Sequence, residues 1–598
     1  MFQEFDVTTR PEQGPARLQA LRAKLADAGV DGFLVPRADA HQGEYVAPRD
    51  DRLAWLTGFT GSAGFCVVLN EIAGVFVDGR YRTQVKGQVA NCFTPVDWPD
   101  VLPGPWILEN LSSGKIGFDP WLYTVGQIEA LQNAVSGSDV SFVPMSNVID
   151  AIWEDQPEPP MAPVKAHPTA IAGEAHADKR TRLAAELTAK GETAAVITLP
   201  DSIAWLLNIR GADIPRNPLA HGFGILNADA TVDLFMAAEK LGAVGAHLGA
   251  SVRVHAPSEF VPHLASRDGT IRLDKASAPL AVQAAVAQSD ATISYGQDPC
   301  VMPKACKNDA EVAGMVEAHL RDGAAVSNFL SWFERQDKTA LTEIDVVRKL
   351  EECRRATNAL LDISFDTIAG TGPHGAIMHY RVTEETNRAL QNGDVMVLDG
   401  GGQYADGTTD ITRTLPISDV DNEIKIAFTR VLQGMIAVSR MRFPKGVAGC
   451  HIEAIGRLPL WSAGQDFDHG LGHGVGAYLC VHEGPQRLAR ISDTPLEPGM
   501  ILSNEPGYYR PGAFGIRLEN LIVVEEAPAL PGGDDHREML QFRTLTYAPI
   551  AREMIVVEML SAEDRAWLNA YHATCRQLLS QRLAPDDNLW LDAATAAL

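Results

Sequence analysis

Four carboxylates in the C-terminal half of the chain lie within or beside apolar runs that are typical of buried strands. Asp399 ends Val395-Met-Val-Leu-Asp, Asp410 begins Asp-Ile-Thr-Arg-Thr-Leu, Glu505 ends Met500-Ile-Leu-Ser-Asn-Glu, and Glu519 lies in Gly515-Ile-Arg-Leu-Glu-Asn-Leu-Ile-Val-Val. An unpaired ion on a buried strand is very costly in free energy, so each acid needs a cationic partner. The sequence therefore constrains the fold to one that gathers these acids around positive charge.

A histidine completes this set. The segment His469-Gly-Leu-Gly-His473-Gly places two imidazoles on a glycine loop that lets the backbone approach a metal or a substrate closely. Four carboxylates brought together resist ionisation unless a large positive charge stands among them, and two divalent cations supply that charge. The predicted metal ligands are Asp399, Asp410, His473, Glu505 and Glu519. This ligand set predicts a metallohydrolase.

The donor types also indicate which metal is bound. Oxygen-rich donors with one imidazole select a hard or borderline cation, and Mn²⁺ is the first choice, with Zn²⁺ or Co²⁺ as alternatives. The turn after Asp399 is rich in glycine, so the two strands that carry Asp399 and Asp410 are predicted to form a hairpin with the acids facing each other. Arg517 and Glu519 alternate onto one face of their strand.

Two further histidines are candidates for proton transfer or for hydrogen bonding to a polarised carbonyl. They are His379, in Gly375-Ala-Ile-Met-His-Tyr, and His482, in Val481-His-Glu-Gly-Pro. His374 is ambiguous from sequence. Arg80, in Asp78-Gly-Arg-Tyr, follows an apolar strand, and a structural turn is favoured over a reach into a neighbouring active site.

The N-terminal half contains two similar segments. Arg17-Leu-Gln-Ala-Leu leads through Phe33-Leu-Val to Asp51-Arg-Leu-Ala-Trp-Leu, and Arg182-Leu-Ala-Ala-Glu-Leu leads through Ala195-Val-Ile to Asp201-Ser-Ile-Ala-Trp-Leu. A helix, a short apolar strand and a helix that carries a Trp form an α/β alternation in each copy. Two related N-terminal α/β domains are therefore expected.

Proline positions and a capping signal indicate the domain boundaries. Prolines 157, 159, 160 and 163 favour an extended connector. Asn308 with Glu311 has capping-box spacing, which predicts that a long helix opens the third domain. The predicted domains are residues 1–160, 161–305 and 306–598, and the last is expected to end in a helical extension beyond about residue 550.

Composition excludes several classes of partner. A formal net charge of −25 argues against nucleic acid and against an anionic membrane surface. The eight cysteines are scattered without a CxxC pair, which fits reduced thiols. The N-terminus has no basic segment followed by an apolar one, and no run of about 18 apolar residues is present. A cytoplasmic enzyme is the expectation.

These motifs together resemble the pita-bread metallopeptidases, which include aminopeptidase P, prolidase, methionine aminopeptidase and creatinase. The match is close in Asp399-Gly-Gly-Gly-Gln-Tyr-Ala-Asp-Gly-Thr-Thr-Asp-Ile-Thr-Arg-Thr, in the segments that begin at His469 and Val481, and in Asn504-Glu-Pro-Gly-Tyr-Tyr. It extends to Glu44-Tyr-Val-Ala-Pro and Gly58-Phe-Thr-Gly-Ser-Ala-Gly. The whole chain is most similar to the long, three-domain Xaa-Pro aminopeptidases. The resemblance implies two creatinase-like α/β domains followed by a pita-bread catalytic domain.

The resemblance also implies roles for individual residues. Asp399 would bind one metal, Asp410 and Glu519 would bridge both, and His473 and Glu505 would bind the other. His379, His469 and His482 match family histidines that hold substrate and assist the transition state, and Arg517 matches the arginine beside the bridging glutamate. The chain departs from the family at Pro373-His374, where a small residue and Asn are usual. Family resemblance also favours a homodimer.

The hypothesis from sequence is a peptidase that removes the N-terminal residue from peptides with proline in second position, by attack of a hydroxide that bridges the metals. Glu505 would relay a proton, and His482 or His379 would donate a hydrogen bond to the oxyanion. Two alternatives are a prolidase restricted to dipeptides, which the length of the chain disfavours, and a non-catalytic pita-bread module that binds peptides or histones. Such modules have lost ligands that are all present here.

Overall fold

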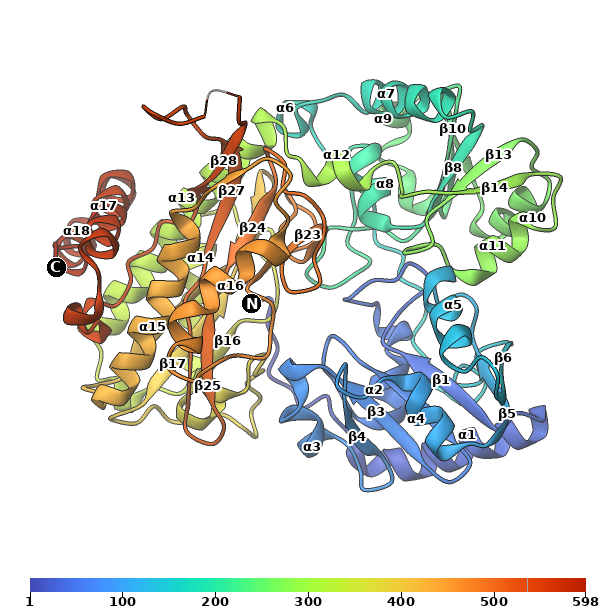
Figure 1. Ribbon diagram of the computed structural model, residues 1–598, viewed down its shortest axis with the longest axis horizontal. Coiled ribbons are helices and arrows are strands. Elements are labelled where there is room, and N and C mark those ends of the chain that lie inside the picture. The colour runs from blue at the N-terminus through green and yellow to red at the C-terminus, as the bar shows by residue number, and fades with distance from the viewer. Residues whose placement is uncertain (535) are drawn as a thin grey trace. The chain divides into compact units, whose positions relative to one another are not determined.

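The computed structural model describes residues 1–534 and 536–598, and these residues form two compact units. The N-terminal unit comprises Thr8–Val301, and the C-terminal unit comprises Met1–Val7 together with Met302–Leu598. Both units are drawn in Figure 1. Each contains mixed α/β structure, as the sequence predicted.

The N-terminal unit contains two six-stranded sheets with the same topology. The first has the order β4-β3-β2-β1-β5-β6 and the second the order β12-β11-β10-β8-β13-β14. The pairings also correspond. In the first sheet β1 pairs antiparallel with β2 and parallel with β5, and in the second sheet β8 pairs antiparallel with β10 and parallel with β13. The predicted duplication is confirmed by this shared strand order.

The strands of the first sheet are β1 (Gly32–Pro36), β2 (Phe65–Leu69), β3 (Ala73–Val77), β4 (Thr94–Asp97), β5 (Ser113–Phe118) and β6 (Asp139–Pro144). Those of the second are β8 (Ala194–Ile197), β10 (Phe223–Asn227), β11 (Val232–Phe235), β12 (Val252–His255), β13 (Thr270–Leu273) and β14 (Thr292–Tyr295). The long helices α1 (Gly14–Ala28) and α7 (His176–Ala189) precede β1 and β8. Every residue of β1 and of β8 is buried, because helices pack beside the strands.

The C-terminal unit opens with helix α13 (Asp309–Glu334), which confirms the predicted capping signal. The Asn308 side chain accepts hydrogen bonds from the backbone N–H groups of Ala310 and Glu311. The other long helices are α14 (Glu343–Arg355), α15 (Asn422–Ser439), α16 (Gly449–Trp461) and α17 (Ala562–Leu579), and α18 (Pro585–Ala594) is shorter. Figure 1 shows α14, α15 and α16 lying across the strands of this unit.

Two sheets of the C-terminal unit carry the acidic motifs. One has three strands in the order β16-β17-β20, namely β16 (Ile368–Thr371), β17 (Val395–Gly400) and β20 (Ile411–Pro416). The other has six strands in the order β21-β28-β27-β24-β22-β23. Its strands are β21 (Arg442–Pro444), β22 (Gly472–Gly474), β23 (Glu483–Leu488), β24 (Ile501–Asn504), β27 (Asn520–Glu526) and β28 (Met539–Thr544). A separate hairpin pairs β25 (Gly507–Arg510) with β26 (Phe514–Arg517).

The predicted hairpin is confirmed, because β17 and β20 pair antiparallel with Asp399 opposite Thr412. The connection between these strands is more elaborate than a simple turn. It folds into a small hairpin of its own, β18 (Gly402–Tyr404) with β19 (Gly407–Thr408). Asp410 lies just before β20, and Glu519 lies in the break between β26 and β27. Both acids therefore sit at strand ends, where the backbone can turn their side chains toward a common point.

A large apolar core holds these elements together. It includes Phe428 and Met435 of α15, Leu502 of β24, and Leu568 and Cys575 of α17. Among the described residues, no helix has the length and apolar character needed to span a bilayer.

Candidate metal centre

The structure brings the predicted ligands together. Asp410, His473 and Glu519 each offer a ligand atom within 4.8 Å of the others. Nε2 of His473 lies 3.5 Å from Oδ2 of Asp410 and 3.4 Å from Oε1 of Glu505. Asp399 is close enough to repel the charge of Asp410. Three of the five predicted ligands thus face one another, and Glu505 and Asp399 lie beside them.

Strand pairing fixes these side chains. The Thr412 hydroxyl, opposite Asp399, donates a 2.8 Å hydrogen bond to Oε2 of Glu519. The backbone N–H of Glu519 donates to the Thr412 carbonyl over 3.2 Å. Thr412 therefore ties the strand that follows Asp410 to the segment that carries Glu519.

Ser503 likewise connects two segments of the cluster, those that carry His473 and Glu505. Its hydroxyl accepts a 2.9 Å hydrogen bond from the backbone N–H of His473 and donates a 3.1 Å bond to Oε1 of Glu505. His473 lies on β22, next to β24, and Glu505 directly follows β24. One serine thus fixes the spacing between the imidazole and the carboxylate.

The electrostatics of the cluster fit bound cations. Burial, followed by repulsion from Asp399 and Glu505, raises the pKa of Asp410 well above its usual value. Burial, followed by repulsion from Asp410, raises the pKa of Glu519 in the same way. Oδ1 of Asp399, Oδ1 of Asp410 and Oε1 of Glu519 are buried without a hydrogen bond. Such oxygens would be very costly in a protein without positive charge between them, and they are the donors that hard cations prefer.

Arg517 lies beside this cluster and leads to a residue that sequence reasoning missed. Its Nη2 donates to Oδ2 of Asp399 over 2.7 Å, and its Nη1 donates to the Tyr509 hydroxyl over 2.7 Å. The same hydroxyl lies 2.9 Å from Nε2 of His469. Tyr509 therefore joins the predicted substrate-binding His469 to Arg517. The available signal was its position in Asn504-Glu-Pro-Gly-Tyr-Tyr, four residues after Glu505.

His482 lies against the metal-site histidine, with its ring centroid 4.2 Å from that of His473 in an edge-on arrangement. The next residue, Glu483, is paired with Gly474 across β22 and β23. The Glu483 carboxylate is fully buried and forms ion pairs with Lys307 and, over 3.1 Å, with Lys304. Sequence reasoning missed this buried anchor because its lysines lie about 180 residues away from it along the chain.

His379 is half-buried and lies in the turn after the 3₁₀ helix η7 (Gly372–Ala376). This helix packs against β26, where a Cβ on Gly515 would come within 1.7 Å of the Gly375 carbonyl oxygen. The close approach sets the position of the turn relative to the strand that ends at Arg517. His379 is therefore held beside the β26 side of the site.

The structure gives His374 and Arg80 structural partners. Nδ1 of His374 lies 3.0 Å from both oxygens of the buried Glu343, and its ring stacks on Tyr380 at 4.4 Å between centroids. Arg80 follows the N-cap Asp78 in a 3₁₀ turn and pairs with that carboxylate over 2.7 Å. The predicted turn at Arg80 is confirmed.

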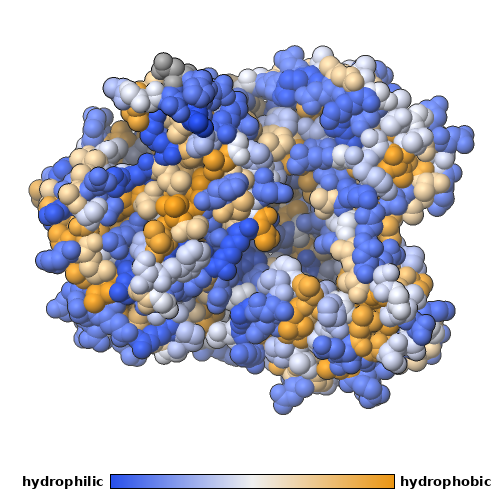
Figure 2. Space-filling model, viewed as in Figure 1, coloured by the Kyte–Doolittle hydropathy of each residue, from blue (hydrophilic) through white to orange (hydrophobic). Residues whose placement is uncertain are grey.

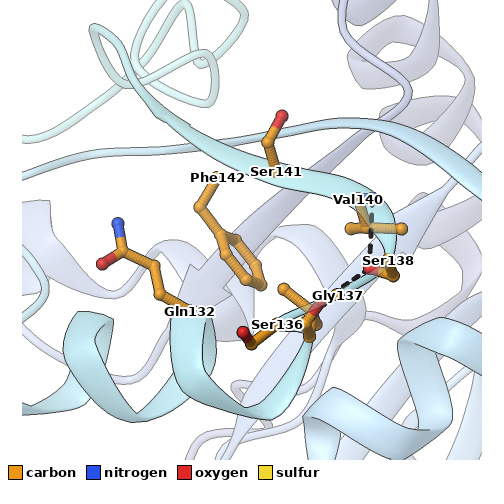
Figure 3. A pocket seen from close by; sticks show the side chains of 8 residues that line it. Gln132, Ser136, Gly137, Ser138, Val140, Ser141 and Phe142 are labelled. Carbon is orange, nitrogen blue, oxygen red and sulfur yellow. Dashed lines mark hydrogen bonds between the residues drawn. The ribbon is translucent and has the colours of Figure 1, made fainter.

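A shallow pocket in the N-terminal unit lies elsewhere. Figure 3 shows that it is lined by side chains between Gln132 and Phe142, at the end of α5 (Val125–Ala134) and the start of β6. The lining residues carry no charged group and no imidazole. This pocket therefore offers no chemistry comparable to that of the acidic cluster.

Sequence comparison defines the class of this fold and site. Residues 313–526 match the metallopeptidase family M24, and residues 538–598 match the C-terminal region of that family. Residues 17–152 and 155–311 each match a creatinase/prolidase N-terminal domain.

Individual relatives narrow the assignment. The chain is 37% identical over 616 residues to aminopeptidase P2 of Arabidopsis thaliana, an alignment that covers 95% of this chain and 86% of the relative. It is 35% identical over 611 residues to a probable Xaa-Pro aminopeptidase P of Aspergillus niger, covering 97% and 98%.

A solved structure agrees with these relatives. The X-prolyl aminopeptidase of Caenorhabditis elegans, described as a cytosolic enzyme with a di-nuclear active site, superposes with a TM-score of 0.92. It is 32% identical, and the match covers 98% of this chain and all of that one. The chain belongs to the aminopeptidase P group of metallopeptidase family M24.

Proposed function

We propose that the protein is a metal-dependent Xaa-Pro aminopeptidase, which removes the N-terminal residue from peptides with proline in second position. The observation that carries the proposal is the buried cluster in which Asp410, His473 and Glu519 face one another around oxygens that have no hydrogen bond. Sequence similarity to aminopeptidases P over nearly the whole chain supports the choice of substrate.

The residue roles belong to this proposal. Asp399 would bind one cation, Asp410 and Glu519 would be shared by both, and His473 and Glu505 would bind the second. Mn²⁺ is the proposed metal, because four carboxylates and one imidazole suit a hard cation. When bound, the two cations would lower the pKa of a water molecule and polarise the scissile carbonyl.

The remaining side chains supply proton handling and positioning. Glu505, half-buried and held by Ser503, accepts a proton from the attacking water and delivers it to the leaving nitrogen. His482, whose ring lies against His473, and His379 donate hydrogen bonds to the developing oxyanion. His469 and Arg517, linked through Tyr509, bind substrate. The bond before proline has no N–H, so recognition uses the ring, the carbonyl and the free amino group.

We also propose the domain boundaries at residues 160 and 305, and a cytoplasmic location. The two family matches that end at 152 and begin at 155 support the first boundary, and those that end at 311 and begin at 313 support a second boundary close to 305. The location rests on similarity to the nematode protein, which is described as cytosolic.

A homodimer is the proposed assembly. Ile455, Leu458 and Trp461 lie three residues apart on α16, and they expose 36%, 55% and 41% of their surface. Ile491 is 88% exposed, and Arg490 lies over the Trp461 ring. Figure 2 shows hydrophilic and apolar areas side by side on one face. Apolar side chains that line one face of a helix favour a protein contact. Leu458→Glu with Ile491→Glu should give a monomer in sedimentation analysis.

Turnover of two substrates tests the activity. Arg-Pro-Pro should be cleaved to release arginine when Mn²⁺ is added, cleavage should stop with a chelator, and Asp410→Ala should be inactive. Gly-Pro should be a far poorer substrate, because an aminopeptidase binds residues beyond the proline. The reverse preference would assign the prolidase alternative, and chelator-insensitive turnover or none at all would contradict the proposal.

A further inference from the structure

A second group of metal-ligand side chains lies in the N-terminal unit. Asp39, Asp50 and His221 each offer a ligand atom within 4.8 Å of the others. Asp39 follows β1 and Asp50 ends the 3₁₀ turn Pro48–Asp50, both in the first α/β copy, whereas His221 precedes β10 of the second copy. The group therefore joins the two copies.

The geometry around Asp39 is unlike that of an ordinary ion pair. Asp39 is 1% exposed, and its Oδ1 accepts hydrogen bonds from the backbone N–H groups of His41 and Gly43. Its Oδ2 lies 3.2 Å from Nε2 of His221. The two atoms are within ion-pair distance, but neither makes a hydrogen bond. A buried carboxylate oxygen and an imidazole nitrogen thus face one another.

The same unit contains a histidine–aspartate pair that serves as a reference. Nε2 of His255 lies 3.0 Å from Oδ1 of Asp233 in hydrogen-bond geometry. Arg253 and Arg267 also donate to the Asp233 carboxylate, which is therefore fully neutralised. In contrast, Oδ2 of Asp39 receives no hydrogen bond from a cation. Its environment resembles that of Oδ1 of Asp410 in the catalytic cluster.

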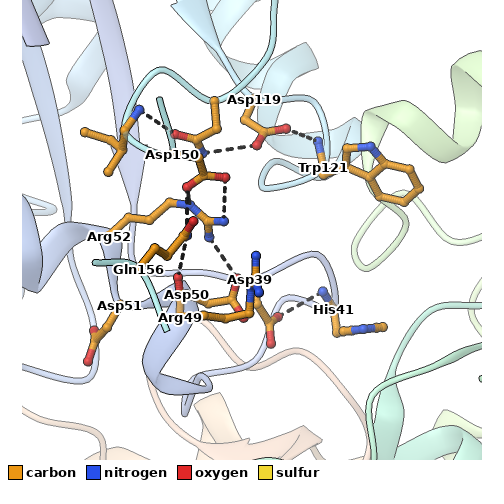
Figure 4. A network of polar contacts seen from close by, with 12 residues as sticks. Asp39, His41, Arg49, Asp50, Asp51, Arg52, Asp119, Trp121, Asp150 and Gln156 are labelled. Carbon is orange, nitrogen blue, oxygen red and sulfur yellow. Dashed lines mark hydrogen bonds and ion pairs between the residues drawn. The ribbon is translucent and has the colours of Figure 1, made fainter. Parts of the chain in front are cut away.

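Arg52 is the cationic side chain that pairs with Asp50, and it is shared with a second carboxylate. Arg52 donates to Oδ1 of Asp50 over 2.9 Å and binds both oxygens of Asp150. Figure 4 shows this guanidinium between the two carboxylates, with Asp39 close by. Asp39 and Asp50 bring carboxylate oxygens within 4.8 Å of each other, so their negative charges repel. The Arg52 guanidinium therefore pairs with two carboxylates, those of Asp50 and Asp150.

His41 packs against His221, and its Nδ1 contacts a backbone carbonyl. Its Nδ1 lies 3.1 Å from the Thr198 carbonyl, and its ring stacks on His221 at 4.7 Å between centroids.

We propose that Asp39, Asp50 and His221 bind one divalent transition-metal cation, of the Mn²⁺ or Zn²⁺ class, that fastens the two α/β copies to each other. Two carboxylates and one imidazole form a donor set suited to such ions. The cation would neutralise the facing oxygens of Asp39 and Asp50 and accept the lone pair of His221. This site is separate from the catalytic cluster and does not depend on the proposed activity.

Metal counting on the full-length protein tests this site. Wild type, His221→Gln, Asp50→Asn and the control His255→Gln are dialysed against MnCl₂ and then against metal-free buffer, and bound manganese per chain is measured. The same series is repeated with ZnCl₂. His221→Gln and Asp50→Asn should each bind one equivalent less than wild type, and His255→Gln should match wild type.

A second readout covers the case in which a variant fails to fold. Wild type loaded with Mn²⁺ should show the paramagnetic resonance spectrum of an isolated Mn²⁺ ion in addition to signals from the catalytic centre, and Asp410→Ala should keep this isolated signal. Equal metal content in wild type and folded His221→Gln, for both metals, would overturn the proposal. So would the absence of an isolated ion in wild type and in Asp410→Ala.

Discussion

Arg517 shows how a single side chain can organise the site. Its guanidinium is buried and donates to both Asp399 and Tyr509, so it fixes the carboxylate of a predicted ligand and orients the Tyr509 hydroxyl at the same time. That hydroxyl in turn contacts His469. Sequence alone indicated the charged members, because an ion in an apolar run is conspicuous. Tyr509 was not singled out from the sequence, because an aromatic residue beside such a run is equally typical of a core, and only its place in Asn504-Glu-Pro-Gly-Tyr-Tyr signalled a role.

Tyr509→Phe tests this network, because it removes only the hydroxyl that contacts Arg517 and His469. Loss of a hydrogen bond to a charged group costs about 1.5–3 kcal/mol, and 1.4 kcal/mol corresponds to about tenfold. We expect kcat/KM for Arg-Pro-Pro to fall by about 10-fold or more, because Arg517 and His469 lose the hydroxyl that links them. Tyr508→Phe, which alters the neighbouring ring, is the control. A kcat/KM equal to wild type in Tyr509→Phe would show that the network has no part in turnover.

At the scale of elements, β22 carries His473, and His482 lies directly before β23, so that the two imidazole rings meet edge-on. The register places Glu483 opposite Gly474, and the two lysines that bind Glu483 come from α12 (Val301–Ala305) and the residue two positions before α13. Local patterns predicted the helix cap at Asn308 and the β17–β20 hairpin. They did not predict the β18–β19 hairpin within it or the break before Glu519, because these depend on tertiary contacts.

Glu483→Gln should destabilise this pair of strands. Removing one partner from a buried ion pair leaves an uncompensated charge and costs about 3–5 kcal/mol. We expect the free energy of unfolding in urea to fall by about that amount, and His482 to lose its fixed position. Glu423→Gln removes a carboxylate that pairs with Arg510 on the surface, and this control should change the stability by less than about 1 kcal/mol. Similar losses for the two variants would contradict the buried anchor.

At the scale of the whole molecule, stability should depend on pH through buried neutral histidines. His572 of α17 is fully buried, and its Nε2 accepts a hydrogen bond from the backbone N–H of Ile550. Burial lowers its pKa to about 3, below the value of about 6.5 in an unfolded chain. The unfolded state therefore binds more protons below pH 6.5, and this contribution to stability is lost as the pH falls from about 6.5 toward 3.

Denaturation at pH 7 and pH 5 measures this effect. His572 should account for a loss of about 2 kcal/mol in the free energy of unfolding between these two values. His572→Gln keeps an acceptor for Ile550 but cannot gain a proton, so its pH dependence should be flatter by that amount. An unchanged slope in this variant would mean that His572 does not carry the effect.

The overall architecture was predictable because it repeats. The two N-terminal copies share an apolar pattern along the sequence, and the structure gives them the same strand order. The cluster that joins the copies was not predicted. Asp39 and His221 are 182 residues apart, and neither lies in a motif that indicates metal binding. A contact between residues so far apart in sequence cannot be predicted from local patterns and is found only in the folded structure.

The central claim is that the acidic side chains of the C-terminal unit, with His473, hold two cations together. X-ray absorption at the manganese edge of the active, Mn²⁺-loaded protein measures this most directly. The expected result is metal–metal scattering at about 3.5–4 Å in wild type, which is lost with turnover in Glu519→Ala. An active wild-type protein that shows no such scattering would contradict the account.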